Sequence, residues 1–231
     1  MWNRYGKVIP FSQAYDSYYA AVREQIVSGQ RILEVGGGAH PSIVDRAQTE
    51  YTIVDPDEPE LAKAPSDVVQ LKSSVQELDD DKKYDLIISK MVLEHLPDPN
   101  SFHESVLRLL TPGGKAIHFF ACRNSVPAWV NRFLPEQWGE AILRQLQNRD
   151  LANQPKYEAY YQRVGGPTKN QMKYFEQMGY EIVQYTGYVG HSYFKKVPLL
   201  FQLEKAYTWV LQVGKVKTLS TVALVILRKP L

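Results

Sequence analysis

The feature that most constrains the fold is a run of three glycines that directly follows an apolar stretch. Residues 31–35 form the apolar stretch and residues 36–38 are the glycines. A short run that is mostly apolar, here with the acid Glu34 near its end, is typical of a strand buried on both faces of a parallel sheet. Glycines permit a tight turn and a close approach of the backbone to a ligand. We therefore expect a strand at 31–35, a tight turn, and then a helix with Pro41 in its first turn.

A second apolar run, at 51–54, ends in Asp55, which comes roughly 20 residues after the Glu34 that precedes the glycines. A glycine-rich first turn followed at this distance by an acid is the Rossmann-type arrangement, in which the acid binds the hydroxyls of a ribose. The spacing predicts a ligand that contains a nucleoside. The alternative is that Asp55 only caps a following helix.

Strands and helices alternate along most of the chain. The apolar runs predict strands at 31–35, 51–54, 68–71, 85–89, 115–121, 181–188 and 220–227. The helical spacing predicts helices at 12–28, 99–110, 125–133, 136–148, 168–178 and 198–212. This alternation indicates an α/β fold, a doubly wound sheet with helices on both faces. The two helices between 122 and 166 predict a lid inserted after the fifth strand, on the ligand side of the sheet.

Composition narrows the class of protein. A length of 231 residues suits one domain, which we divide into an N-terminal helical cap (1–30), a cofactor-binding half (31–121), the lid (122–166) and a C-terminal half (167–231). A net charge of +2, spread along the chain, does not suggest a nucleic-acid partner. A single cysteine, Cys122, excludes an internal disulfide and a multi-cysteine metal site, and it fits a cytoplasmic location.

The loop itself distinguishes two nucleotide cofactors. A nicotinamide dinucleotide loop has the pattern G-x-G-x-x-G, and here Pro41 stands where its third glycine belongs. A loop that binds S-adenosylmethionine instead has an acid just before its G-x-G, which Glu34 supplies. The sequence thus favours the methyl donor, with a nicotinamide-dependent oxidoreductase as the alternative.

Two further motifs follow the loop in the same order and spacing as in a known family. They are Tyr84-Asp85-Leu86-Ile87-Ile88-Ser89 with Met91 to Pro99, and Leu109-Leu110-Thr111-Pro112-Gly113-Gly114. With the glycine loop, they resemble the class I S-adenosylmethionine-dependent methyltransferases of the UbiE/Coq5-like, type 11 group. The resemblance implies a Rossmann-like, seven-stranded sheet with an antiparallel last strand. It also implies S-adenosylmethionine as cofactor and S-adenosylhomocysteine as product.

Carried over by position, the resemblance assigns roles around the cofactor. Gly36, Gly37 and Gly38 would lie against its methionine end, and Glu34 would orient the loop or bind the cofactor's ammonium. Asp55 would accept hydrogen bonds from both ribose hydroxyls, a task suited to a carboxylate.

The remaining cofactor residues depart partly from the family pattern. Ser74 and Val75 would lie at the adenine edge, with a serine where the family has an acid, and Lys90 would line the methionine half through its backbone. His40 replaces a further glycine of the family's loop, and the resemblance does not explain it.

Methyl transfer to a hydroxyl or amine also requires loss of a proton, whereas a carboxylate acceptor requires none. We predict His191, in a turn after the sixth strand, as the base, and His95 as a second catalytic candidate; the alternative for each is a structural histidine. Some methyltransferases bind magnesium through E-x-x-E-H. Here the first acid is replaced by Met91, a poor ligand for a hard cation, so we expect no metal.

The acceptor is expected to be a small molecule bound near Asn124, Tyr161 and Tyr193. We predict methylation of an oxygen, hydroxyl or carboxylate, of a secondary metabolite, glycan or lipid-like precursor. A non-catalytic cofactor-binding partner protein is the third alternative. A monomer or homodimer is expected, with no membrane-spanning segment. Lysines flank the amphipathic run 198–212, which leaves peripheral membrane contact open, although packing on the sheet is favoured.

Overall fold

The structure is a computed structural model that describes residues 5–43, 45–79, 81–125, 128–129, 157–191 and 198–231. Within these residues an eight-stranded sheet has the order β1-β7-β8-β6-β5-β2-β3-β4. The strands are β1 (Tyr5–Pro10), β2 (Arg31–Val35), β3 (Glu50–Val54), β4 (Val69–Leu71), β5 (Tyr84–Lys90), β6 (Leu110–Ala121), β7 (Glu181–Val189) and β8 (Val222–Arg228).

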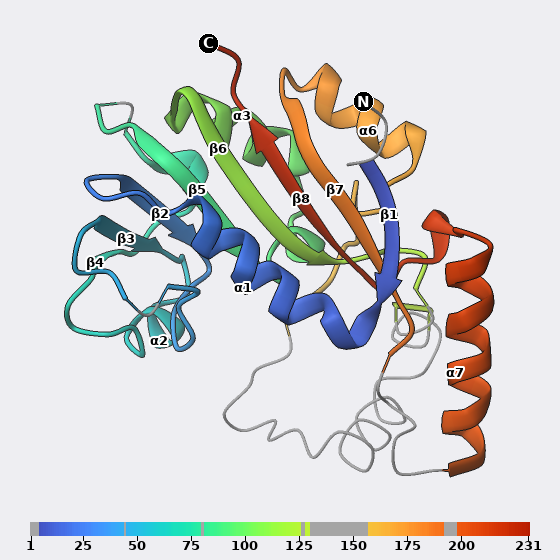
Figure 1. The fold of residues 1–231 in the computed structure, drawn as a ribbon. Helices are drawn as coiled ribbons and strands as arrows, with labels where there is room; N and C mark the ends of the chain where they lie inside the picture. The colour runs from blue at the N-terminus through green and yellow to red at the C-terminus, as the bar shows by residue number, and fades with distance from the viewer. Residues whose placement is uncertain (1–4, 44, 80, 126–127, 130–156, 192–197) are drawn as a thin grey trace.

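Helices cover both faces of the sheet, as predicted (Figure 1). The helices are α1 (Ala14–Gln25), α2 (Glu58–Leu61), α3 (Pro99–Leu109), α6 (Lys169–Gln177) and α7 (Pro198–Val213). Short 3-10 turns include η3 (Val75–Glu77) and η4 (Leu93–His95). Helix α1 packs on one face, α3 and α6 pack on the other, and α7 stands along the β1–β7 edge (Figure 1).

The last strand is antiparallel, as expected, because β8 pairs antiparallel with both β6 and β7. The sheet has eight strands rather than seven, however, because Tyr5–Pro10 adds β1 in parallel to the outer edge of β7. The segment assigned to an N-terminal helical cap therefore contributes a strand as well as helix α1. Residues 5–10 contain a glycine and end in a proline, two residue types that are rare in strands, so their sequence did not predict a strand. In the structure the glycine, Gly6, has a positive φ.

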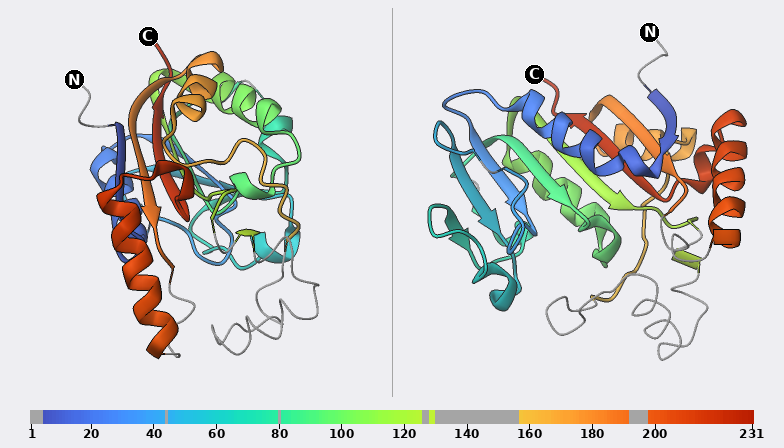
Figure 2. Two further views of the ribbon diagram at one scale, coloured as in Figure 1. Left: turned by 90° about the vertical axis from the view of Figure 1, so that its right-hand side faces the viewer. Right: turned by 60° about the horizontal axis from the view of Figure 1, so that its bottom comes forward.

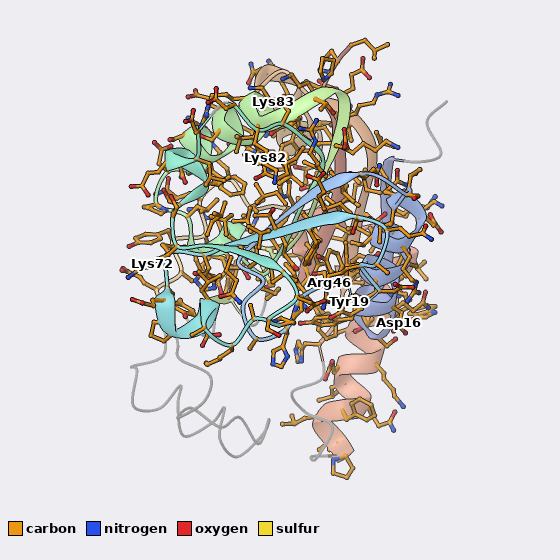
Figure 3. All side chains as sticks on the ribbon, turned by 90° about the vertical axis from the view of Figure 1, so that its left-hand side faces the viewer. Asp16, Tyr19, Arg46, Lys72, Lys82 and Lys83 are labelled. Carbon is orange, nitrogen blue, oxygen red and sulfur yellow. The ribbon has the colours of Figure 1, made fainter. Side chains whose placement is uncertain are left out.

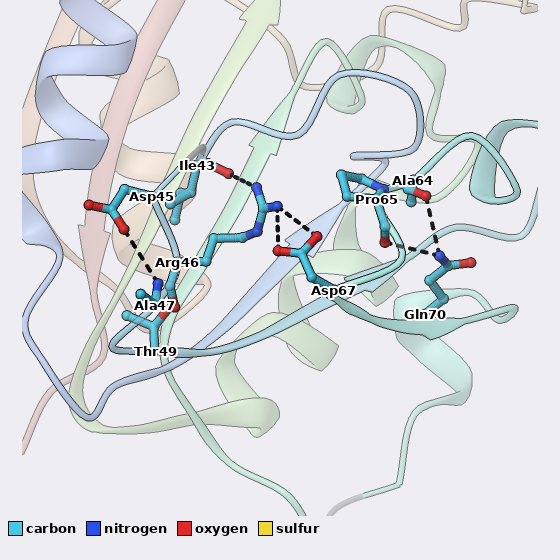
Figure 4. A network of polar contacts seen from close by, with 9 residues as sticks. All are labelled: Ile43, Asp45, Arg46, Ala47, Thr49, Ala64, Pro65, Asp67 and Gln70. Atoms are coloured by element: carbon cyan, nitrogen blue, oxygen red, sulfur yellow. Dashed lines mark hydrogen bonds and ion pairs between the residues drawn. The ribbon is translucent and has the colours of Figure 1, made fainter.

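The helix expected after the glycines is absent from the described part of 36–49. The backbone N–H of Ser42 donates to the side chain of Glu34 instead of entering a helical turn. Arg46 then donates to the carbonyl of Ile43 and to both carboxylate oxygens of Asp67, which ties this segment to the approach to β4 (Figure 4). Side-chain hydrogen bonds thus replace the helical bonds that Pro41 was expected to initiate.

Helix α3 shows why some helices could be predicted closely from the sequence. Asp98 caps its first turn by accepting from two backbone N–H groups, and Pro99 occupies the first helical position. Phe102, Val106 and Leu109 recur at helical spacing and are all buried against the sheet. The cap, the proline and the apolar stripe all agree, and the helix ends within one residue of the prediction.

The strand order indicates where a ligand crevice is expected, outside the carboxyl ends of the strands at which that order reverses. From the central β2 the chain proceeds outward to β3 and β4, and then returns to place β5 on the other side of β2. All of these neighbours are parallel, so their carboxyl ends lie at the same edge. Ligands of doubly wound sheets bind outside such a reversal in strand order. The reversal lies between β2 and β5, directly beyond Val35 and Lys90.

The two helices predicted at 125–133 and 136–148 lie almost wholly outside the described residues, and the lid stays a prediction. The next described segment begins at Tyr157 and lies at the carboxyl edge of the sheet before α6 begins. The predicted division of the chain into four parts likewise stays a prediction.

Candidate functional site

The first turn after β2 requires a glycine at Gly36. Its φ is +76°, and a Cβ at this position would lie 2.6 Å from Cγ2 of Val92, which follows β5. The N–H of Gly36 donates to the carbonyl of Val54 over 2.9 Å. Gly36 itself is exposed at the crevice. Any larger residue would force apart the two segments that border the crevice.

Glu34 lies beneath this turn with no exposed surface. Its carboxylate accepts from the N–H of Ser42 at 2.9 Å and from the hydroxyls of Ser42 and Tyr51. Burial raises the pKa of Glu34, while these hydrogen bonds oppose the rise. A Cβ on Gly37 would clash with this carboxylate, so loop and acid pack in direct contact. Of the two predicted roles, these contacts favour orienting the loop.

Gly38 and Lys90 connect the loop to its neighbours. A Cβ on Gly38 would lie 2.4 Å from the carbonyl oxygen of Glu60 in α2. The ammonium of Lys90 donates to the carbonyl of His40 at 3.0 Å and to the hydroxyl of Tyr19 at 3.1 Å. Tyr19 comes from α1 (Figure 3). Lys90 was predicted to act through its backbone; its side chain ties α1, β5 and the loop together.

This contact also gives His40 a place that the family pattern did not explain. His40 is exposed, and its backbone carbonyl accepts the hydrogen bond from the ammonium of Lys90. A backbone carbonyl is available from any residue type, so a glycine is not required at this position. The loop geometry therefore accommodates the substitution.

Asp55 follows β3 at the same edge of the sheet and is half-buried. Its Oδ1 accepts from the N–H of Asp57 at 2.8 Å, and Oδ2 has no hydrogen-bond partner among the described residues. Burial raises the pKa of this carboxyl. A half-buried carboxylate with a free oxygen suits a ligand's hydroxyl groups, so this donor set fits the ribose of S-adenosylmethionine.

Ser74 and Val75, predicted at the adenine edge, follow β4 and begin η3. The N–H of Ser74 donates to Glu77 Oε2 at 3.2 Å. The side chain of Val75 is buried in the core beside α3. Their contribution to adenine binding stays a prediction.

A strap formed by residues 157–161 crosses the carboxyl edge. The hydroxyl of Tyr157 donates to Asp57 Oδ2 at 2.6 Å, beyond β3. At the other end, the N–H groups of Tyr160 and Tyr161 donate to the carbonyl of Glu94, beyond β5, at 2.9 and 3.0 Å. The strap thus bridges the ends of two strands that flank β2.

The strap accounts for two of the predicted site residues. Nδ1 of His95 bonds to the carbonyl of Glu158 over 2.6 Å, so this ring holds the strap. Tyr161 has a φ of +50° and packs, half-buried, against the core. Asn124 is exposed after β6, and Tyr193 lies outside the described residues. The roles of these four residues in catalysis or acceptor binding stay predictions.

Glu94 is the residue whose chemistry the sequence did not reveal. It is 2% exposed, and neither carboxylate oxygen makes a well-formed hydrogen bond within the described part of the chain. Burial raises its pKa to about 7, partly opposed by the backbone groups of Glu94 and Ala121. Its charge also raises the pKa values of Tyr15 and Cys122, which places it between α1 and the end of β6. The pairing of glutamate and histidine in the sequence suggested only a metal motif.

His191, the predicted base, follows β7. Its N–H donates to Oε1 of Glu204 in α7 at 2.9 Å, and its Nδ1 lies 3.3 Å from the same oxygen. Burial lowers the pKa of His191, and Glu204 opposes that shift. In the sheet, β8 and β6 separate β7 from β5. His191 as base stays a prediction, and its contact with Glu204 fixes it to α7.

His118 in β6 is fully buried, with Nδ1 2.8 Å from the hydroxyl of Ser89. Its ring meets that of His103 edge to face, inside a cluster of rings between the sheet, α3 and α6. Burial lowers the pKa of both histidines. Both therefore remain neutral and serve packing.

Comparison with known proteins gives the family. A model of the methyltransferase domain matches residues 11–185. An uncharacterized methyltransferase from Mycobacterium ulcerans is 29% identical over 161 residues, which cover 66% of this chain and 58% of that protein. A ubiquinone biosynthesis O-methyltransferase from Coxiella burnetii is 28% identical over 139 residues, covering 53% and 56%. The chain thus spans less than two thirds of the length of these relatives.

Solved structures share the fold. The N-methyltransferase NodS from Bradyrhizobium japonicum has a TM-score of 0.55 at 14% identity, covering 94% of this chain and 96% of NodS. An S-adenosylmethionine-dependent methyltransferase structure from Listeria monocytogenes has a TM-score of 0.59 at 10% identity, covering 95% and 100%. The family uses S-adenosylmethionine, which the Gly36 turn and Asp55 suit. With its sequence match extending over most of its length, this chain belongs to the methyltransferase domain family.

Proposed function

We propose that this protein transfers a methyl group from S-adenosylmethionine to a hydroxyl oxygen of a small-molecule acceptor. The observation that carries the proposal is the half-buried Asp55, beside the Gly36 turn where the strand order reverses. One of its carboxylate oxygens has no hydrogen-bond partner among the described residues. Family membership supplies the cofactor class. The proposal retains oxygen as the acceptor atom and narrows it to a hydroxyl.

S-adenosylmethionine, when bound, supplies an electrophilic methyl group on a positively charged sulfur. The chain's task is then to bind, align and shield the reactants. Asp55 would accept hydrogen bonds from the ribose hydroxyls through Oδ2. Glu34 and Lys90 would hold the Gly36 turn in its bound shape, since each already fixes one part of it. The strap 157–161 would exclude water from the side of the crevice nearest Asp57.

Glu94 supports a hydroxyl as the acceptor group. A buried carboxyl that lacks a well-formed hydrogen bond to the described residues is costly unless a ligand supplies a donor, and a hydroxyl would do so. A base with a pKa about 7 is well matched to proton transfer near neutral pH. In the proposed step the acceptor's O–H bond breaks, its proton passes to a carboxylate oxygen of Glu94, and the acceptor oxygen keeps the electron pair. An acceptor carboxylate would gain nothing from such a base.

The relatives agree only in part on the acceptor atom. The protein from Coxiella burnetii is described as an O-methyltransferase of ubiquinone biosynthesis, and NodS as an N-methyltransferase. The sequence similarity to the former supports oxygen as the acceptor atom. NodS shows the shared fold alone, so amines form a comparison arm of the test.

The test uses methyl-labelled S-adenosylmethionine and a panel containing a catechol, an aliphatic alcohol, a carboxylate and a primary amine. We expect label in a hydroxyl-bearing compound, with turnover greatly reduced in Glu94→Gln. Label only in the amine or the carboxylate would contradict the proposed acceptor. Binding of NAD in place of S-adenosylmethionine would instead support the oxidoreductase alternative. Cofactor binding without labelling of any compound, including those in cell extract fractions, would support a non-catalytic partner protein.

A further inference from the structure

Helix α7 presents an apolar stripe to solvent. Leu199, Leu203, Val210 and Val213 recur at alternating spacings of four, seven and three residues, which place them on one side of a helix. They are 74%, 60%, 55% and 63% exposed. Ala206 completes the stripe between Leu203 and Val210 and is also exposed. An outward helix face is normally polar, and a contiguous apolar patch of this kind marks an interaction site.

The opposite side of α7 is fixed to the sheet, so the stripe cannot turn inward. Glu204 and Leu211 are the buried residues of the helix. Glu204 accepts from the N–H of His191 beyond β7. A Cβ on Gly190 would lie 2.4 Å from the hydroxyl of Thr208, so helix and strand end pack in direct contact there. Figure 2 shows α7 at the outer edge of the molecule, with its lower half extending past the ends of the strands.

The charges near the stripe indicate the kind of partner. Lys205 on α7 and Lys215 just after it are exposed. The sequence from 198 to 220 contains a single acidic residue, Glu204, and that residue is buried against His191. Pairing α7 with the same helix of a second copy would therefore bring lysines together with no exposed acid to neutralise them. An anionic surface complements both the lysines and the stripe.

The aromatic residues of α7 fit a lipid surface better than a protein groove. Trp209 borders the stripe and is 64% exposed. Tyr207 is half-buried on the side nearer the sheet. Tryptophan and tyrosine are enriched where a hydrocarbon region meets water. No helix in the described part of the chain is long and apolar enough to cross a bilayer, so contact at the described surface is peripheral.

We propose that α7 docks the protein on an anionic lipid bilayer, with the stripe of Leu199, Leu203, Ala206, Val210 and Val213 inserted among the headgroups. Lys205 and Lys215 then lie near the lipid phosphates. Helix α7 borders the carboxyl edge of the sheet, where the candidate site lies (Figure 1). The docked protein would hold that edge close to the membrane surface. This inference depends on α7 alone and does not require the proposed methyl transfer.

The test is flotation of the full chain with vesicles of phosphatidylcholine alone or mixed with phosphatidylglycerol. We expect binding to the mixed vesicles, and a loss of about tenfold or more in Leu203→Glu with Val210→Glu. Val27→Glu is the matched control, because Val27 is 61% exposed outside α7; it should bind as the unaltered protein does. Circular dichroism and thermal unfolding establish that each variant is folded.

Two further measurements distinguish the lipid surface from other occupants. Lys205→Glu with Lys215→Glu should weaken binding to the mixed vesicles severalfold and leave cofactor affinity unchanged. Sedimentation should show the same oligomeric state for the unaltered protein and the Leu203→Glu, Val210→Glu variant. Absence of binding to the mixed vesicles, equal loss in Val27→Glu, or a dimer that dissociates only in the α7 variant would overturn the proposal.

Discussion

The hydroxyl of Tyr157 donates to Oδ2 of Asp57 over 2.6 Å, although the two residues are 100 positions apart in the chain. Asp57 caps α2 and lies two residues beyond Asp55. Burial and the adjacent carboxylate raise the pKa of Tyr157, so the phenol stays protonated and keeps this bond at neutral pH. The segment that returns from 130–156 is therefore attached beside the proposed ribose acid.

Replacement of Tyr157 by phenylalanine should weaken cofactor binding. Loss of one hydrogen bond from the strap corresponds to about 0.5–1.5 kcal/mol, or roughly a twofold to tenfold rise in Kd. Tyr160→Phe is the matched control, because the hydroxyl of Tyr160 bonds to Glu158, two residues away within the strap. Calorimetric titration with S-adenosylhomocysteine measures both. Equal affinities of Tyr157→Phe and Tyr160→Phe for S-adenosylhomocysteine would show that the strap does not contribute to cofactor binding.

Glu34→Ala should destabilise the fold, since Glu34 accepts from the backbone and side chain of Ser42 and from Tyr51 in a fully buried setting. Stranding these donors should lower the free energy of unfolding by about 2–4 kcal/mol. Glu58→Ala, which removes an exposed ion pair with Lys72, should change it by less than about 0.5 kcal/mol. Urea unfolding compares the two. A small effect of Glu34→Ala would show that the loop does not depend on this acid.

Where local signals agreed, the sequence predicted the fold well. Strands β2, β3 and β5 lie within one residue of their predicted ends, and α3 and α6 were equally clear. Strand β1 was missed because it is stabilised by pairing with β7, at the far end of the chain, and not by any apolar pattern of its own. A helix after the glycines was expected because a proline is common in the first turn of a helix. In the structure the N–H of Ser42 instead donates to the Glu34 carboxylate.

Glu94→Gln should remove one limb of the pH profile of methyl transfer. With a pKa of about 7, Glu94 is ionised above neutrality, so the rate of the unaltered protein should rise as pH passes through 7. The amide cannot take a proton, and the variant should be about 100-fold to 10,000-fold slower with no such limb. Rates measured from pH 5.5 to 8.5 with labelled donor decide this. An unchanged limb in Glu94→Gln would exclude Glu94 as the base.

His191→Ala provides the competing prediction. If Glu94 is the base, this variant should retain the limb near pH 7, because His191 is bonded to Glu204 at the α7 edge. Loss of the limb in His191→Ala and its retention in Glu94→Gln would restore the assignment made from the sequence. Cofactor affinity measured in parallel distinguishes a loss of chemistry from a loss of binding.

The same carboxyl predicts how stability depends on pH. The pKa of Glu94 is about 7 in the folded protein against an ordinary value of 4.5. Its protonated form therefore favours the fold, and this stabilisation is complete below pH 4.5 and disappears as pH rises through 7. Glu94→Gln should become more stable than the unaltered protein by up to roughly 3 kcal/mol above that range. Urea unfolding at pH 5 and pH 8 measures the difference, and equal differences at both pH values would contradict it.

Only part of the candidate site could be predicted from the sequence, because some of its contacts join segments that are distant in the chain. Glu34, Gly36 and Asp55 occur in a short, ordered pattern, so their places followed from the first strands. The bonds of Lys90 to His40 and Tyr19 join three separate segments. Glu94 stands out only because its carboxylate is buried without a well-formed hydrogen bond to the residues that the structure describes. Sequence spacing cannot reveal either relation, since both depend on which distant segments meet.

The central claim is that the Gly36 turn and Asp55 bind the methyl donor. Calorimetric titration with S-adenosylhomocysteine and NAD, using the unaltered protein and Asp55→Ala, tests it most directly. Asp67→Ala is the control for an exposed acid, because Asp67 precedes β4 and so lies at the opposite ends of the parallel strands from Asp55. We predict binding of S-adenosylhomocysteine alone, weakened about 10-fold to 100-fold in Asp55→Ala and unchanged in Asp67→Ala. Absence of binding by the unaltered, folded protein, or equal affinity in Asp55→Ala, would contradict the account.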